Sequence, residues 1–280
     1  MRKLVVFAIL AMAVTASAQF GGRNRSAGGM GQNLGPTGGN CVLPGYRRGT
    51  GEDDTSSPRD IDRSGFVYGR LRYHPVEWWR QRTNEVPWHH DYPDGDTMLP
   101  DALERLTTVH TTKDSFQIVD IDGKDLFKYP FVYLSEPGFL DLLPGDVKNL
   151  REYLDRGGFL FVDDFRGNEF DNSEMENFVV QLKKLYPDRN LVPLKPDHLI
   201  FQSFFDTDPA NMLPPYRRPN SGNPQFLGMS DDKDRLMIMV DFNNDLSEYW
   251  QTLDVGICSI KESGTAVQLG INYVIYTMTH

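Results

Sequence analysis

An uninterrupted apolar run, Phe159 to Val162, lies between the glycine pair Gly157–Gly158 and the carboxylates Asp163 and Asp164. A short apolar run bounded in this way is typical of a strand buried on both faces, as in a parallel sheet. Ligands of open α/β sheets bind outside the carboxyl ends of such strands. The pattern therefore predicts a central strand here and a ligand crevice near the two aspartates.

Residues 66–73 alternate apolar with polar or small side chains, which predicts a strand with one buried face. Apolar runs predict further short strands at 116–121, 131–134, 191–194, 225–229 and 235–240. Residues 209–224 are proline-rich and are expected to form a surface loop.

Helical periodicity predicts four helices between these strands. The first is expected to begin at Asp96 or Thr97. The second should cover 147–154 with Gly157 as its C-cap, the third 173–185 and the fourth 265–279. Ser173 and Glu176 have the spacing of a capping box. Strands that alternate with helices of about three turns indicate an α/β fold with a mostly parallel sheet and helices on both faces.

The N-terminal segment has the pattern of a signal peptide. Arg2 and Lys3 precede an apolar run, and Ala16-Ser17-Ala18 follows as a small-residue cleavage site, so we expect cleavage near Ala18 and a periplasmic or secreted protein. The run is shorter than the ~20 residues of a spanning helix, so we expect no spanning segment in the mature chain. Residues 19–64 are rich in Gly, Asn and Pro and predict a disordered tether, and 65–280 predict a single domain.

Charge and cysteine content narrow the classes of partner. The net charge of -10 argues against nucleic acid, whose binding proteins usually carry a basic face. The sequence has two cysteines, Cys41 and Cys258. An oxidising compartment permits a bridge between them, but two cysteines far apart give no framework signal, so we expect them to be unpaired.

Several motifs occur in order between residues 65 and 280: Phe66–Tyr73 with Trp78–Trp79, Tyr129–Leu134, Leu150–Leu154 with Gly157–Leu160, Asp197–His198, and Leu269–Tyr276. This set resembles the bacterial family catalogued as domain of unknown function 4159. The resemblance implies a class I glutamine amidotransferase-like fold, a flavodoxin-like three-layer α/β sandwich. It implies no known reaction.

The nucleophile of that fold is missing from this sequence. Amidotransferase-like enzymes carry a nucleophilic cysteine on a sharp turn between a strand and a helix. The strand that most resembles the elbow strand ends in Asp163-Asp164-Phe165, with no Cys or Ser at the turn. We therefore do not expect cysteine-based amide hydrolysis.

Polar residues at the expected strand ends, together with two adjacent tryptophans, are the candidate ligand-binding residues. They are Glu136, Asp163, Asp164, Arg166, His198, Asn243, Asp245, Trp78 and Trp79. Paired carboxylates with a histidine can bind a hard metal ion, perform acid–base chemistry or hold a polar ligand such as a sugar. Of the aspartate pair, we expect Asp163 in the crevice, and Asp164 to cap backbone amides or pair with Arg166.

Each candidate also has a structural interpretation. An aspartate after a strand often caps a helix, a histidine such as His198 often holds a loop, and of two adjacent tryptophans one is usually in the core. His89-His90-Asp91 resembles a metal cluster, but adjacent histidines on a flexible loop rarely face one ion, so it ranks low.

Two functional hypotheses follow. The first is an exported, non-catalytic binding domain without a cofactor, whose partner is a polysaccharide, a peptide or a protein of the cell envelope. The alternative is an atypical hydrolase that uses Asp163, Asp164 and His198, with a divalent metal as its cofactor. The missing nucleophile favours the first hypothesis.

Overall fold

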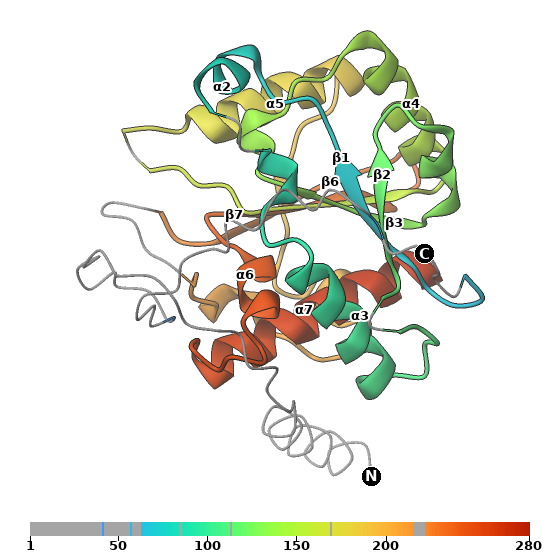
Figure 1. Cartoon of the computed structure of the whole chain (residues 1–280), viewed down its shortest axis with the longest axis vertical. Helices are drawn as coiled ribbons and strands as arrows, with labels where there is room; N and C mark the ends of the chain where they lie inside the picture. Colours follow the sequence, from blue (N-terminus) through green and yellow to red (C-terminus); the bar gives the residue numbers. More distant parts are fainter. Residues whose placement is uncertain are drawn as a thin grey trace.

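The computed structural model describes Cys41, Ser57 and residues 63–83, 86–112, 114–168, 170–215 and 222–280. The expected signal segment and most of the expected tether lie outside these residues. A seven-stranded sheet crosses the middle of the molecule in the order β2-β1-β3-β4-β7-β6-β5 (Figure 1). The strands are β1 (Tyr68–Arg72), β2 (Phe116–Asp120), β3 (Phe131–Ser135), β4 (Phe159–Asp163), β5 (Val192–Pro193), β6 (Gln225–Ser230) and β7 (Leu236–Phe242).

The sheet is mostly parallel, as the sequence predicts. Strands β2, β1, β3, β4 and β7 run parallel to one another, whereas β6 is antiparallel to both β7 and β5. The short turn at residues 231–235 joins β6 directly to β7. Strands joined so closely can only pair antiparallel, because a parallel pair needs a crossover of a dozen or more residues.

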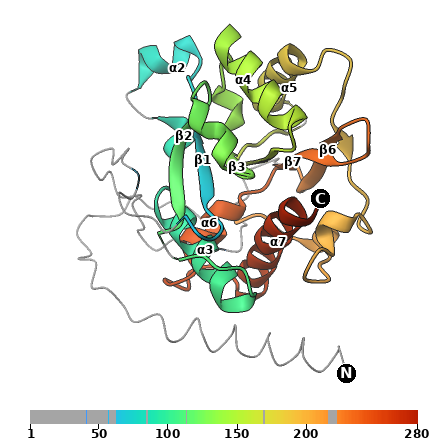
Figure 2. The ribbon, with the colours of Figure 1, turned by 90° about the vertical axis from the view of Figure 1, so that its right-hand side faces the viewer.

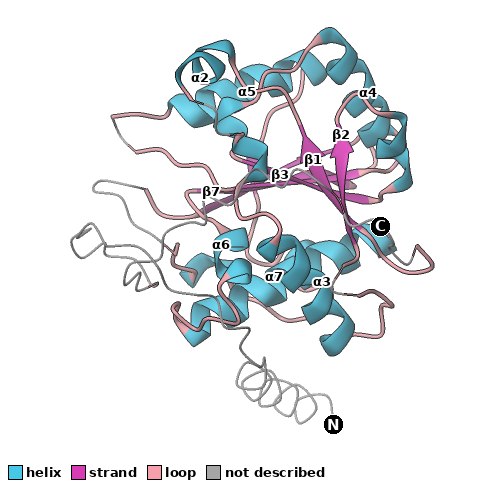
Figure 3. Ribbon diagram, in the orientation of Figure 1, coloured by secondary structure: helices cyan, strands magenta, loops and turns pink. Residues whose placement is uncertain are grey.

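Helices cover both faces of the sheet and give the molecule three layers (Figures 2 and 3). One outer layer contains α4 (Pro144–Asp155) and α5 (Ser173–Leu185), with α2 (Glu77–Arg82) at its end; the other contains α3 (Asp94–Leu106), α6 (Leu246–Gln251) and α7 (Ile260–Thr279). Five short 3-10 helices lie in the described connections: η1 (Pro87–His89), η2 (Lys124–Lys128), η3 (Pro137–Phe139), η4 (Leu199–Phe201) and η5 (Pro209–Asn211).

Strand β4 is the middle strand, and all its residues are buried. Phe159 and Phe161 pack in the apolar cluster that includes α6 and α7, while Leu160 and Val162 pack in the cluster that includes α4 and α5. This burial on two faces confirms the prediction from the apolar run. Gly157 ends α4 with φ +106°, a conformation that glycine adopts readily.

Two local predictions were wrong, and one helix was missed. Strand β1 is buried on both faces, because Arg70 is fully buried beside an acidic partner instead of facing water. Asn172 is the N-cap of α5, so Ser173 is already helical and no capping box forms. Helix α6 was not predicted, since its six residues are too few for a periodic signal and all of them are buried.

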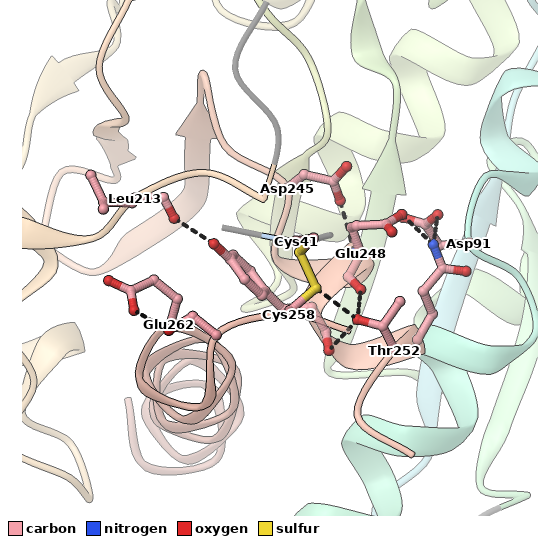
Figure 4. Close-up of a disulfide and its surroundings, with 11 residues drawn as sticks. Cys41, Asp91, Leu213, Asp245, Glu248, Thr252, Cys258 and Glu262 are labelled. Atoms are coloured by element: carbon pink, nitrogen blue, oxygen red, sulfur yellow. Dashed lines mark hydrogen bonds between the residues drawn. A yellow bond between two sulfur atoms is a disulfide. The ribbon is translucent and has the colours of Figure 1, made fainter. Parts of the chain in front are cut away.

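The prediction of unpaired cysteines was also wrong. Cys41 and Cys258 form a disulfide across a sequence separation of 217 residues, and both side chains are buried in the cluster around α6 and α7 (Figure 4). At least this residue of the expected tether is therefore fixed to the domain. Within the described part of the chain, no helix combines the length and apolar character needed to cross a membrane.

Candidate functional site

The carboxyl edge of the parallel strands carries an unusual backbone conformation. The chain passes from β1 to β2 on one side and then to β3 on the other, so the strand order reverses between β1 and β3. Ligands of open α/β sheets bind at this switch point. The residues directly after β3, β4 and β7 are Glu136, Asp164 and Asn243, with φ of +48°, +60° and +58°. Non-glycine residues rarely adopt such values, which cluster at functional sites.

His90 occupies the centre of this edge. Its Nδ1 hydrogen-bonds with Oδ2 of Asp164 and lies 3.2 Å from Oε1 of Glu136, while its Nε2 lies 3.7 Å from Oδ1 of Asp91. The side chain is 9 % exposed. Burial opposes protonation of the ring, but Asp164, Asp91 and Glu136 together outweigh it and raise the pKa of His90 to about 9. The environment therefore favours a positive charge at this position.

Arg166 links two carboxylates of the same edge. Its Nη1 donates to Oδ1 of Asp164 at 2.8 Å, and its Nη2 donates to Oδ2 of Asp245 at 2.9 Å. Asp245 in turn accepts a hydrogen bond from the backbone N–H of Glu248 at 2.9 Å and caps α6. The predicted residues Glu136, Asp164, Arg166 and Asp245 are thus brought together around His90 or its direct partners.

Asp164 pairs with Arg166 as expected, but the expected crevice role of Asp163 is wrong. Asp163 is fully buried, and its Oδ2 accepts hydrogen bonds from the backbone N–H groups of Leu246 at 2.7 Å and Ser247 at 3.1 Å. It therefore caps α6, whereas Asp164 contacts His90. The alternation of β4 explains this, since Asp163 follows Phe159 and Phe161 on the face towards α6 and α7.

The stability of the metal-free protein should depend on the protonation of Asp163. Burial and the nearby Asp164 raise the pKa of this carboxyl to about 7 despite the backbone hydrogen bonds. Protonation of Asp163 therefore contributes its full stabilisation of the fold below pH ~4, the ordinary pKa of an aspartate in the unfolded chain. This contribution is lost as the pH rises through 7, the pKa in the fold. We expect the thermal midpoint in EDTA to fall between pH 5 and pH 8, and the fall to be smaller in Asp163→Asn. Parallel pH profiles for the two proteins would contradict this.

His198 lies far from the aspartates. It lines a surface pocket with Gly157 and Arg235, which precede β4 and β7, and so lies at the amino edge of the sheet. Its Nδ1 accepts a hydrogen bond from the backbone N–H of Ile200 at 3.2 Å and caps η4. The set of Asp163, Asp164 and His198 is therefore not assembled in this structure.

Trp78 and Trp79 lie on α2 and contact Phe139, which follows Glu136 by three residues. The ring centroids of Trp79 and Phe139 are 4.2 Å apart, and Trp78 is 48 % exposed. One of the two tryptophans was expected in the core, and this was wrong. Neither is buried, and α2 contains no buried residue. We call Trp78, Trp79 and Phe139 the aromatic rim.

Asn243 holds a loop instead of facing His90. Its Oδ1 accepts a hydrogen bond from the backbone N–H of Gly167 at 2.8 Å, and its side chain is buried. It thereby fixes the segment that follows Arg166.

The sequence reasoning missed the residues that position His90. Arg70 donates to Asp96 and to the backbone oxygens of Trp88 at 3.2 Å and His90 at 2.9 Å. Asp91 accepts hydrogen bonds from Oγ of Ser247 and Nε2 of Gln251, both at 2.6 Å. The sequence predicts a flexible loop at His90-Asp91 and therefore a poor site, but Arg70 fixes this loop through the backbone oxygen of His90. The sequence of β1 offers only a weak signal for this, since Arg70 and Arg72 both fit the alternation of a strand with one exposed face.

Among the residues that the structure describes, two overlapping groups at this edge have the ligand atoms to hold a metal ion. They are His90, Glu136 and Asp164, and Asp91, Asp164 and Asp245; within each group the ligand atoms lie within 4.8 Å of one another. Asp164 belongs to both groups.

The chain was also compared with known proteins. No curated protein matches it. A family model described as Domain of unknown function (DUF4159) matches residues 76–278, which is well over half of the chain. The chain that carries this buried histidine and carboxylate site therefore belongs to the DUF4159 family of domains of unknown function.

Proposed function

We propose that this protein is an exported, non-catalytic domain that binds a polysaccharide at the carboxyl edge of its sheet. One observation carries the proposal. Both cysteines of the sequence are in the disulfide, and the left-handed positions after β3, β4 and β7 hold Glu136, Asp164 and Asn243. The strand ends thus offer the partly exposed carboxylate of Glu136 and no thiol nucleophile.

The order of the parallel strands supports a flavodoxin-like, amidotransferase-like fold. The order β2-β1-β3-β4-β7 corresponds to the order 2-1-3-4-5 of flavodoxin-like sheets, with β7 as the fifth parallel strand. In this view β6 and β5 extend that sheet as an antiparallel edge.

The chemistry of the edge favours a neutral, hydroxyl-rich ligand. Glu136, whose side chain is 21 % exposed, offers carboxylate oxygens that accept hydrogen bonds from hydroxyl groups. The aromatic rim beside it offers ring faces that stack on a sugar. The excess of buried carboxylates disfavours anionic ligands.

Export is supported by the disulfide. Disulfides persist in oxidising compartments and are rare in the cytosol. This agrees with the predicted signal segment at residues 1–18.

Calorimetric titration of the full chain with a panel of soluble polysaccharides tests the binding proposal. For a polysaccharide that binds, we expect Trp78→Ala and Glu136→Gln each to raise the Kd about tenfold, the equivalent of one lost stacking or charged contact. Phe204→Ala is the matched control, because Phe204 is an exposed aromatic residue outside this site. Absence of binding across the panel, or equal losses in all three variants, would contradict the proposal.

A metal-dependent hydrolase is the second candidate. It is favoured by the contact of His90 with Asp164 and Glu136, which replaces the proposed use of His198. Release of reducing ends from a bound polysaccharide separates the two candidates. Zinc-dependent release that is lost in Glu136→Gln would identify the hydrolase, whereas binding without release supports the non-catalytic domain.

A further inference from the structure

We propose that His90, Glu136 and Asp164 form a site for one Zn²⁺ ion, held by Nδ1 of His90 and one carboxylate oxygen from each acid. The site goes beyond the binding function, because a bound ion is compatible with recognition or with catalysis. It depends on the geometry of two strand ends and of the loop that carries His90.

The donor atoms match zinc in number and type. Two donors of one tetrahedral zinc ion lie roughly 3.3 Å apart, so Nδ1 of His90 and Oδ2 of Asp164, which are hydrogen-bonded here, must separate to admit the ion. Nδ1 of His90 lies 3.2 Å from Oε1 of Glu136, and all three donor atoms lie within 4.8 Å of one another. One imidazole nitrogen with carboxylate oxygens suits Zn²⁺, whereas Mg²⁺ and Ca²⁺ prefer oxygen ligands alone. The two carboxylates balance the charge of a divalent ion when the imidazole is neutral.

A separate observation at His90 points to the same ion. Within the described part of the chain, Nε2 of His90 is buried and has no hydrogen-bond partner. It faces Oδ1 of Asp91 at 3.7 Å, which is beyond hydrogen-bond length. Histidine ligands of metals almost always donate their second N–H to a carboxylate or carbonyl group. With zinc on Nδ1, a small shift of the ring completes that hydrogen bond to Asp91.

Further side chains hold the ligands in place. Arg166 donates to the other oxygen of Asp164, and Ser247 and Gln251 both donate to Asp91. The backbone oxygen of His90 accepts from Arg70 at 2.9 Å. The histidine and one carboxylate ligand thus have partners that fix their orientation before an ion binds.

Three protein ligands leave a fourth position of a tetrahedral ion open. Glu136 is the most exposed of the three ligands, with 21 % of its side chain exposed against 9 % for His90 and none for Asp164, so solvent reaches the site from the Glu136 side. An exogenous hydroxyl group or a water molecule would complete the coordination there.

Zinc titration of the full chain tests the site. The protein, with its disulfide intact and stripped with EDTA, is titrated with ZnCl₂ by calorimetry, and zinc retained after dialysis is counted by mass spectrometry. We expect one Zn²⁺ per chain and no comparable binding of Mg²⁺. His90→Gln and Glu136→Gln should each weaken zinc binding at least ~100-fold, and Asp91→Asn about 10–100-fold, as for other outer partners of metal ligands.

His89→Gln and His198→Gln are the matched controls, because His89 is the neighbour of His90 in the chain and His198 lies at the other edge of the sheet. Both should bind zinc as the unmodified protein does. Circular dichroism establishes that each variant is folded, and if His90→Gln is not, Glu136→Gln decides, since its side chain is partly exposed. A folded chain that retains no zinc, or zinc binding unchanged in Glu136→Gln, would overturn the proposal.

Discussion

Replacing Arg70 with methionine is expected to lower the free energy of unfolding by about 3–5 kcal/mol, the usual cost of removing one member of a buried ion pair. The side chains of Arg70 and Asp96 are both fully buried, and they form an ion pair between β1 and α3. The guanidinium also lies over the ring of Tyr133, 4.4 Å from its centroid. Methionine fills a similar volume but leaves the Asp96 carboxylate and two backbone oxygens without a donor.

Arg72 provides the matched control on the same strand. It pairs with Asp120, but the two side chains are 42 % and 48 % exposed, and pairs at the surface contribute less than ~1 kcal/mol. Urea unfolding of Arg70→Met and Arg72→Met compares the two pairs directly. We expect the double variant Arg70→Met, Asp96→Leu to recover much of the loss, because no unpaired charge remains buried. Equal losses at Arg70 and Arg72 would show that the buried pair does not hold the His90 loop in place.

Loss of the disulfide should have an effect of similar size. We expect Cys41→Ser to lower the free energy of unfolding by about 3–5 kcal/mol, because a bridge across a long loop restricts the unfolded chain strongly. The loop spans 217 residues, and both cysteines are buried in the core. The disulfide also lies beside α6, where Oγ1 of Thr252 lies 3.2 Å from Sγ of Cys258 (Figure 4). Its loss should therefore loosen the helix that Asp163 and Asp245 cap.

Urea unfolding with and without a reducing agent measures this effect. The reduced protein should match Cys41→Ser, and the double variant Cys41→Ser, Cys258→Ser should match the single variant, because each lacks the same bridge. If reduction leaves the midpoint unchanged, the bridge does not stabilise the fold.

The parts of the fold that could be predicted are those with strong local patterns. The apolar run of β4 and the helical period of α4 and α7 each repeat one signal over several residues, and they were placed correctly. Burial of β1 on both faces could not be predicted, because it depends on an ion pair with Asp96, 26 residues later in the chain. The disulfide joins segments too far apart for any local signal.

The location of the site could be predicted, but not its central residue. Strand ends converge at one edge of a parallel sheet, so Glu136, Asp164 and Asp245 were found from their positions after strands. His90 follows no strand and reaches the edge from the loop before α3, which Arg70 holds. His198 was chosen from its place in the sequence order, and the structure puts it at the opposite edge.

A crystal of the full chain soaked in ZnCl₂ and measured on both sides of the zinc absorption edge would locate the proposed ion at His90, Glu136 and Asp164. Anomalous differences locate the ion without reference to any ligand or activity. We expect one peak within about 2.0–2.2 Å of Nδ1 of His90 and of oxygens of Glu136 and Asp164. No peak at this edge, or a peak only beside His198 at the amino edge of the sheet, would contradict the proposed site.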